Sequence, residues 1–544
     1  MSSRERDARA RLASLRLGGT GDGEAGVPGD DDAAAATTGG TVLGGGAWNI
    51  TSMVVPQLYV VIVSVAAARY LGPAGMGRQS YIAFVAMAMT SLLSGGLSLA
   101  LMRFVGEARG LGRSAELRSL VSFAWRAQGG VALVGSAALC VVALLGADPQ
   151  SAWVLAAAGC GLGILHTVPS SVLFGLQKWR EASIVGMATG GVAVPLVIVV
   201  LAYGGGITGM FAVEAAVSAV NLVLIGIWAR RVLGRTSASR RSAGELRGAT
   251  ARYALVSTGS VALTLIVWRR SEFFFLEQYA SDPEIAVYSI AFSAVTAVRL
   301  IPEAMGAVIT PAFATLFGAG ASDRIRSGYS RAVRLLLTLT LPLTGGLLVL
   351  GPPALRIVYG EDYAASGPIL AVMVATLPLV AVLNVSEGLL VGLGRVRAPL
   401  IAGGIAAIAN IALAFALIPG HGAMGAALAS ATAQIVAALA VFAPALRTIG
   451  RIRLEPFVLL RAAGASIGAS AIASAILTVN DGIGGVVVAT IAGVVALLVL
   501  ARLLRVVTRD DAMWLETTTR RYLPQSLRSI FRLFAPTEAR SRTP

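Results

Sequence analysis

Long apolar runs, separated by short charged segments, restrict how this chain can fold more than any other feature. Several runs are longer than eighteen residues, among them 127–146, 422–443 and 482–500. A helix of that length crosses the roughly 30 Å hydrocarbon core of a bilayer. Only 13% of the 544 residues are charged, about half the share typical of soluble domains. The sequence therefore predicts an all-α polytopic membrane protein, because a β-barrel would show shorter, alternating segments.

The apolar runs divide into about fourteen candidate transmembrane spans, flanked by two polar tails. The first tail is rich in glycine, aspartate and arginine, and the second is rich in arginine. The predicted segments are a disordered cytoplasmic tail (1–40), an N-terminal six-helix bundle (41–229), a basic cytoplasmic linker (230–252), a C-terminal six-helix bundle (253–445), two additional transmembrane helices (446–506) and a basic cytoplasmic tail (507–544).

The basic residues lie almost entirely on one side of these spans. With a cytoplasmic N-terminus, 38 of the 44 Lys and Arg residues fall in cytoplasmic segments, and three (Arg69, Arg78 and Arg356) fall on the opposite side. This asymmetry follows the positive-inside rule and predicts a multi-pass protein of the cytoplasmic (inner) membrane with both termini in the cytoplasm. The basic residues that give the net charge of +16 then face the anionic lipids of the inner leaflet. This placement accounts for the charge, and no nucleic-acid partner is expected.

The two six-helix segments carry related sequences. GLQKWREASIVGMATGG at 175–191 parallels GLGRVRAPLIAGGIAAI at 392–408, and GGGITG at 204–209 parallels GHGAMG at 420–425. Offsets of 217 and 216 residues correspond to six spans, so both halves have the same orientation in the membrane. Parallel repeats of this kind are typical of transporters, whose binding cavity lies between the halves.

The stretch GHGAMG also fits the G-x-G-x-x-G pattern of dinucleotide-binding folds. That fingerprint requires a preceding strand and an acidic residue about twenty positions further on. Here the preceding segment, 399–418, is a membrane-length helix, and no Asp or Glu occurs between Glu387 and Glu455. We therefore predict that these glycines form a turn between antiparallel helices.

Charged residues inside apolar spans are costly to bury and are candidate functional residues. Arginine in a substrate cavity can bind a phosphate through charge-assisted hydrogen bonds. Snorkelling to the membrane interface and internal Arg–Glu pairing are the alternatives. The candidates for lining a substrate cavity, in the seventh and eighth spans, are Arg269, Arg270, Glu272, Arg299 and Glu303.

Five further residues are candidates for ion coupling or gating: Glu214, Glu387, His166, Arg69 and Arg103. A carboxylate or imidazole in a span can carry a proton or bind an ion, and an interhelical hydrogen bond is the alternative. The two arginines lie at span ends, where a role at the membrane interface is the alternative to gating. Two cysteines and two histidines make no metal-binding pattern. No metal, cofactor or catalytic constellation is expected, and the chain is not expected to be an enzyme.

Several stretches, taken in order, resemble one transporter superfamily over about residues 41–510. The combined pattern resembles the polysaccharide (O-antigen-type) flippase branch of the multidrug/oligosaccharidyl-lipid/polysaccharide (MOP) exporter superfamily. The stretches that carry this resemblance are ARYLGPAGMGRQSYIAF (68–84), LSLALMRFVGEARG (97–110), AVYSIAF (286–292), IPEAMGAVITPAFATLF (301–317), IVYGEDYAASGPILAVM (357–373) and the region 392–434.

The resemblance implies two six-helix bundles arranged as a V, with two added helices. It implies movement of a polyprenyl-pyrophosphate-linked oligosaccharide from the inner to the outer leaflet by alternating access, driven by an ion gradient or the membrane potential. The headgroup would pass through a hydrophilic, cationic cavity while the lipid tail stays in the bilayer. The expected partners are the lipid-linked saccharide, membrane lipids and, through the cytoplasmic tails, envelope glycan assembly proteins.

Three other functions stay open. A multidrug or cation antiporter of the same superfamily would place carboxylates in the cavity, and the first five spans contain none. A peptidoglycan-precursor lipid flippase would share the fourteen spans and the basic cavity, but the first span lacks the arginines expected for that branch. A non-transporting membrane scaffold would use the tails to recruit partners, but it would not account for the repeat or the buried charges.

Overall fold

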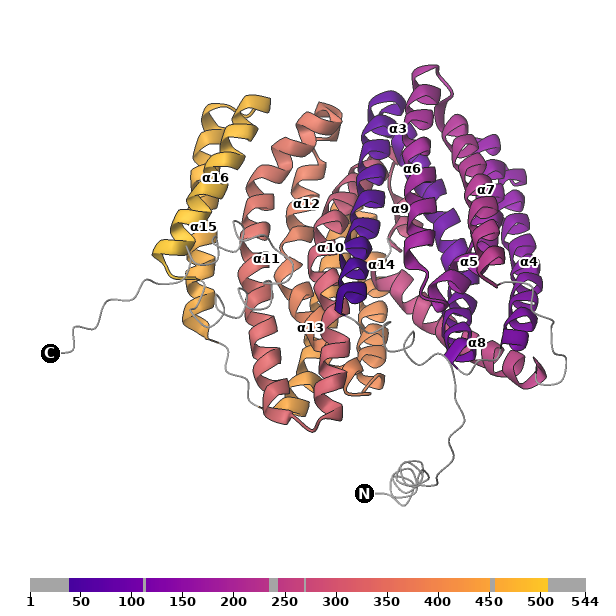
Figure 1. Cartoon of the computed structure of the whole chain (residues 1–544). Coiled ribbons are helices and arrows are strands. Elements are labelled where there is room, and N and C mark those ends of the chain that lie inside the picture. Colours follow the sequence, from indigo (N-terminus) through magenta and orange to yellow (C-terminus); the bar gives the residue numbers. More distant parts are fainter. Residues whose placement is uncertain (1–38, 111–113, 234–242, 269–270, 451–454, 507–544) are drawn as a thin grey trace. The chain divides into compact units, whose positions relative to one another are not determined.

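The computed structural model describes residues 39–110, 114–233, 243–268, 271–450 and 455–506. These residues form helices and short turns, and no strand occurs among them (Figure 1). Almost all of the predicted N-terminal tail, all of the predicted C-terminal tail (507–544) and part of the predicted linker lie outside the described residues. The chain divides into two units, 1–49 and 50–544. Only 39–49 of the first unit is described, as the helical start of α3, and the account below concerns the second unit.

The helices follow one another with short connections. Those of the first half are α3 (Gly39–Gly110), α4 (Ser114–Leu144), α5 (Gln150–Gly175), α6 (Trp179–Ala202) and α7 (Gly206–Leu233). Those of the second half are α8 (Ala243–Trp268), α9 (Phe273–Tyr279), α10 (Asp282–Gly318), α11 (Ser322–Tyr359), the 3-10 turn η1 (Glu361–Tyr363), α12 (Ser366–Val374), α13 (Leu377–Gly392) and α14 (Arg397–Ile449). Two further helices, α15 (Pro456–Val479) and α16 (Ile483–Leu503), complete the described chain.

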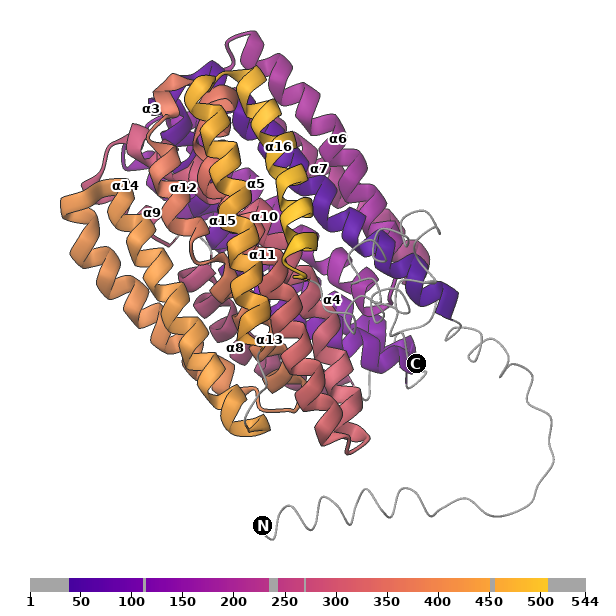
Figure 2. The ribbon, with the colours of Figure 1, turned by 90° about the vertical axis from the view of Figure 1, so that its left-hand side faces the viewer.

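Twelve helices in the described residues are long and apolar enough to cross a membrane, and two of them are double length. Val54–Arg109 has 56 residues and Arg397–Ile449 has 53, whereas about 20 suffice for one crossing. Each double-length helix bends at a glycine with positive φ, Gly72 at +68° and Gly422 at +50°. Figure 2 shows the two arms of α14 side by side. Counting each arm as a span gives the fourteen that the sequence predicts.

Matching turns in the two halves reflect the sequence repeat. Gly204 and Gly206 in the first half and Gly422 in the second have positive φ, so both glycine motifs of the repeat are helix turns. Gln177, at φ +58°, and Gly394, at φ +75°, also correspond at the repeat offset of 217 residues. The prediction that GHGAMG is a turn is therefore confirmed for its backbone.

Replacing Gly422 by alanine should lower the thermal stability of the protein. An alanine in the left-handed region costs about 1–2 kcal/mol, and its Cβ would lie 2.3 Å from Glu284 Oε1. Gly420→Ala is the matched control, because a Cβ there meets nothing within 4 Å and the φ angle is not positive. Thermal unfolding in detergent measures both variants. Equal midpoints would contradict the view that Gly422 is required by the turn.

The sequence predicts one continuous seventh span over 253–279, and the structure interrupts it. Helix α8 ends at Trp268 and the separate short helix α9 begins at Phe273. Two side chains bind the Ile266 carbonyl next to this break. Ser271 Oγ donates to this carbonyl at 2.6 Å, and Asn410 Nδ2 donates to it at 2.9 Å.

Helix α8 contacts both halves of the chain. Near its start, Tyr253 and Ala254 pack against the apolar cluster of the first half, and near its end Val267 belongs to the cluster of the second half. A Cβ on Gly96 would lie 2.1 Å from Thr258 Oγ1, so α3 and α8 approach closely there. Helix α8 thus connects the two halves through side-chain packing as well as through the polypeptide backbone.

The two additional helices are fixed to α11 at both ends and in the middle. Arg334 pairs with Glu455 at 2.5 Å, and Arg356 pairs with Asp481 at 2.5 Å. Between them, Ser466 Oγ donates to the Leu341 carbonyl at 2.9 Å. The hydrogen bond from Arg356 lowers the pKa of Asp481, so this pair is intact at neutral pH. It is lost only as the pH falls below the ordinary carboxyl range.

Candidate functional site

A cavity of about 360 Å³ lies where helices of the two halves meet. Both arms of α3, together with α6 and α7, form most of its wall, and α10 of the second half closes it. Its polar lining residues are Tyr59, Ser64, Gln79, Ser80, Glu214, Ser218, Ser289 and Ser293. We call it the central cavity. Hydroxyl and amide groups along an otherwise apolar wall can hydrogen-bond a polar or hydrated ligand.

Glu214 of α7 is the only charged residue among the described residues that line the central cavity. It also lines a second cavity of about 240 Å³, bounded by α3, α5 and α7. Its side chain is exposed and lines both cavities. The described wall therefore contains a carboxylate and no basic residue, which differs from the cationic lining implied by the family resemblance.

The sequence-predicted arginines fall into two groups. Arg269 and Arg270 lie outside the described residues. Arg299, on α10, is 8% exposed, and its Nη2 lies 3.1 Å from Glu303 Oε1, one turn further along the helix. Arg299 and Glu303 therefore form the internal Arg–Glu pair that was the alternative to substrate binding. Arg299 is absent from the described lining of the central cavity.

Glu272 lies at the break between α8 and α9, away from the central cavity. It is 1% exposed and has Asn410, Tyr288 and Ser430 as polar neighbours. Asn410 also donates to Ser271 Oγ at 3.1 Å. These groups come from α10, α14 and the segment between α8 and α9, so they form a buried polar cluster inside the second half. Interrupted membrane helices with polar surroundings are common binding sites for ions and substrates in transporters.

Three other predicted residues lie in different places and line neither described cavity. His166 of α5 contacts Ser170, whose Oγ lies 3.2 Å from Nε2. Glu387 is exposed on α13. The guanidinium of Arg103 lies 4.7 Å from the ring centroid of Tyr253, on α8. Arg103 thus contacts the helix that links the halves.

Arg69 binds the other half of the chain. Its Nη2 donates to the Ile357 carbonyl at 2.6 Å, and its Nε donates to the Val358 carbonyl at 3.0 Å. Close by, Tyr363 Oη donates to the Ala68 carbonyl at 2.9 Å. Burial raises the pKa of Tyr363 to about 12, so this hydroxyl stays protonated and remains a donor at physiological pH.

Arg78, on the second arm of α3, also reaches the second half. It contacts Glu277 at 2.7 Å and Asp282 at 3.5 Å. A Cβ on Gly77 would lie 1.7 Å from the Asp282 carbonyl oxygen, so only glycine permits this approach. We call these contacts of Arg69, Tyr363 and Arg78 the hairpin-end clamp, because they lie where α3 and α14 bend. The opposite end of the helices is called the basic end.

Sequence reasoning assigned Arg78 and Arg356 only to the non-cytoplasmic side and gave neither a role. The structure places Arg69 and Arg78 between the halves and Arg356 between α11 and the added helices. The sequence did mark these three arginines as unusual, because only three of the 44 basic residues fall on the predicted non-cytoplasmic side. Tyr363 and Gly77 had no comparable signal, since their importance depends on what lies opposite them.

Comparisons with known proteins identify the fold. Residues 260–416 match the MatE family, whereas no curated protein matches the chain by sequence. Over 84% of this chain and 98% of its own length, the structure of the lipid II flippase MurJ in an inward closed conformation is similar, with TM-score 0.66 and 14% identity.

Two further structures share the fold. An inward-facing multidrug resistance MATE family transporter of the MOP superfamily is similar over 72% of this chain and 94% of its own, with TM-score 0.63 and 17% identity. A MOP superfamily transporter from Pyrococcus furiosus, for which the reverse polarity of its binding pocket suggests a different function, covers 74% and 94%, with TM-score 0.56 and 16% identity. The chain therefore has the helical fold of MOP superfamily transporters and contains a MatE match in its second half.

Arg78→Gln should loosen the clamp and expose the central cavity from the hairpin end. A hydrogen bond between charged groups contributes about 1.5–3 kcal/mol, so we expect labelling of a cysteine at Ala193, in the cavity wall, to rise about tenfold or more. The measurement uses an impermeant thiol reagent on a variant lacking Cys140 and Cys160. Arg356→Gln is the control, because Arg356 pairs with the added helices and not across the halves. Equal rates in all variants would show that Arg78 does not close the cavity.

Proposed function

We propose that this protein is a flippase that moves a polyprenyl-pyrophosphate-linked oligosaccharide from the inner to the outer leaflet by alternating access. The observation that carries the proposal is a cavity with a polar lining between two repeated halves, in a chain with two extra helices fixed to α11. A cavity with serine, glutamine and tyrosine side chains suits a hydroxyl-rich headgroup. The saccharide would pass between the halves while the polyprenyl chain remains in the bilayer.

The length of the structural match supports a flippase over a twelve-span exporter. The match with the lipid II flippase covers 84% of 544 residues, or about 457 residues, whereas Gly39–Ile449 spans 411 positions. That match must therefore extend beyond the twelve-span body, and α15 and α16 are the helices described there. The multidrug transporter match covers 72%, or about 392 residues, which the twelve-span body alone accommodates.

The hairpin-end clamp supplies the gate that alternating access requires. In the orientation predicted from the basic residues, this end faces away from the cytoplasm. Arg69, Arg78 and Tyr363 would keep the central cavity closed to that side while a substrate enters from the inner leaflet. Because each of them binds a group of the opposite half, rocking the halves apart would break all of these contacts together.

Glu214 is the coupling residue in this proposal. Of Glu214, Glu387 and His166, it is the one that lines the described cavities. A carboxylate there can take up a proton or bind a cation when the cavity faces one side and release it on the other. Glu272, enclosed in the second half, is better placed to hold an ion or proton than to contact a saccharide.

A second candidate function, multidrug or cation antiport, is favoured by the same carboxylate. An anionic group in the central cavity attracts a cationic drug, whereas a pyrophosphate requires the arginines of the broken span or of α10. Two further alternatives, a peptidoglycan-precursor flippase and a scaffold that recruits glycan assembly proteins through its tails, share the same fold.

Deleting the gene separates these functions. The flippase proposal predicts that a polyprenyl-pyrophosphate-linked oligosaccharide accumulates in the inner leaflet, with normal resistance to cationic drugs. Accumulated peptidoglycan precursor would assign the protein to the related flippase function. Increased drug sensitivity with normal glycolipid would support the antiporter, and normal transport of all three with disordered glycan assembly would support the scaffold.

Glu214→Gln should uncouple transport from the ion gradient without abolishing it. The amide keeps the size of the side chain but cannot lose or gain a proton, so gradient-driven accumulation in proteoliposomes should be lost while downhill exchange remains. Glu387→Gln is the matched control because it lines neither described cavity. A Glu214→Gln protein that still accumulates substrate against its gradient would exclude this residue from coupling.

The pair on α10 can be tested by neutralising both members. If Arg299 only satisfies Glu303, the double variant Arg299→Gln/Glu303→Gln should retain transport, because no charge is left unpaired. If Arg299 instead binds the substrate pyrophosphate, the double variant should fail about as severely as Arg299→Gln alone. Complementation of the deletion strain, with membrane abundance measured in parallel, decides between the two results.

A further inference from the structure

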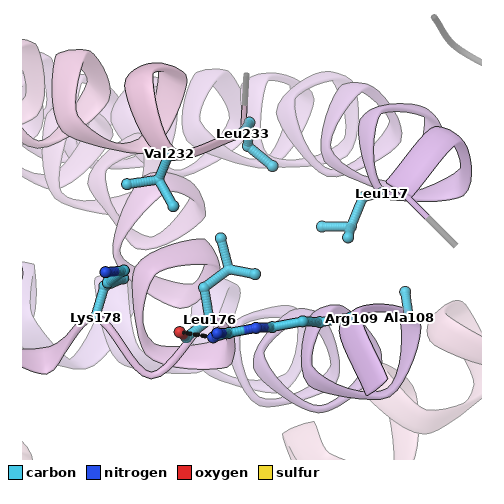
Figure 3. A pocket seen from close by; sticks show the side chains of 7 residues that line it. All are labelled: Ala108, Arg109, Leu117, Leu176, Lys178, Val232 and Leu233. Atoms are coloured by element: carbon cyan, nitrogen blue, oxygen red, sulfur yellow. Dashed lines mark hydrogen bonds between the residues drawn. The ribbon is translucent and has the colours of Figure 1, made fainter. Parts of the chain in front are cut away.

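A pocket of about 310 Å³ lies at the basic end of the first half, separate from the central cavity. The end of α3, the start of α4, the α5–α6 turn and the end of α7 form it. Five of its lining residues are apolar (Ala108, Leu117, Leu176, Val232 and Leu233) and two are cationic (Arg109 and Lys178). Figure 3 shows the two cations along one side, with Leu117, Val232 and Leu233 drawn opposite.

The α5–α6 turn positions both cations. Arg109 Nη1 donates to the carbonyl of Leu176, the C-cap residue directly after α5. A guanidinium has five N–H donors, so this contact fixes the side chain and leaves donors for a ligand. Lys178 stands directly before α6 and is 44% exposed, with Glu181 at 3.7 Å. Two positive charges therefore flank the same turn, at the mouth of an apolar pocket.

The backbone of this turn is strained at Gln177, whereas the second half has a glycine at the matching position. Gln177 has φ +58°, whereas its counterpart in the second half is Gly394 at φ +75°. Left-handed backbone is unfavourable for a residue with a Cβ. In the second half, the counterpart of Lys178 is Arg395, which donates to Thr448 Oγ1 at 2.7 Å. The first half thus keeps its turn cation beside the pocket, while the second half uses it within the protein.

We infer that this pocket binds the phosphate of an anionic phospholipid from the leaflet at the basic end. The phosphate would lie between Arg109 and Lys178, and the first methylenes of the acyl chains would contact Leu117, Val232 and Leu233. A soluble phosphate would use the cations but not the apolar wall. Basic pockets between membrane helices are known sites for anionic lipid headgroups. This inference does not depend on what the central cavity carries.

Native mass spectrometry of the purified full-length protein, titrated with phosphatidylglycerol or phosphatidylethanolamine, tests the inference. We expect preferential retention of phosphatidylglycerol. Lys178→Gln should weaken that retention about fivefold, the effect of about one positive charge near an anionic lipid. Lys178 is half-exposed and makes no cross-helix bond in the described structure, so this variant should fold. Arg109→Gln should weaken retention at least as much, and the double variant should weaken it further.

Arg324→Gln is the matched control, because Arg324 is exposed at the start of α11 and lines none of the described pockets. Its retention of phosphatidylglycerol should equal that of the unmodified protein. Equal retention in the Lys178, Arg109 and Arg324 variants would overturn the inference. It would show that the retained lipid binds non-specifically around the protein and not in this pocket. Displacement of the lipid by inorganic phosphate at similar concentrations would also overturn it, by showing a site for soluble anions.

Discussion

The contacts between the halves at the hairpin end organise the described structure. Arg69 donates to two carbonyls at the end of α11, and Arg78 pairs with Glu277 and Asp282 beside α9 and α10. Phe84 of α3 also stacks on Phe273 of α9, with ring centroids 5.1 Å apart. Each contact joins residues about 190 to 290 positions apart in the sequence. These contacts therefore fix the position of one half against the other at a place where no chain connection does so.

That constraint explains features that otherwise look unrelated. Glycine is needed at position 77, because α3 must approach Asp282 closely for Arg78 to reach its partners. Gly422 carries the bend of α14 against Glu284, next to the same contact. The central cavity lies just behind the clamp, lined by both arms of α3. In the proposed function these contacts close the cavity at one end, and exchanging them for others at moderate cost would provide a physical basis for alternating access.

The sequence was sufficient for the architecture because membrane helices have a strong pattern. Run length gave fourteen spans, the repeat located both glycine turns, and the charge distribution picked out Arg69, Arg78 and Arg356 as exceptional. The site was harder to predict, because it depends on which helix faces meet. Span length could not show that the seventh span breaks before α9, or that Glu272 lies in a polar cluster of the second half. Nor could spacing show that Glu214, rather than an arginine, lines the described cavity.

The central claim is that the clamp opens during transport, and a distance measurement across it is the most direct test. Spin labels at Tyr203 and Tyr279, both exposed at the hairpin end of opposite halves, report its width in proteoliposomes. The protein would lack Cys140 and Cys160, the two native cysteines. The account predicts that adding lipid-linked oligosaccharide under an ion gradient produces a second, longer distance population. One unchanged distance under all conditions, in protein shown to transport, would contradict it.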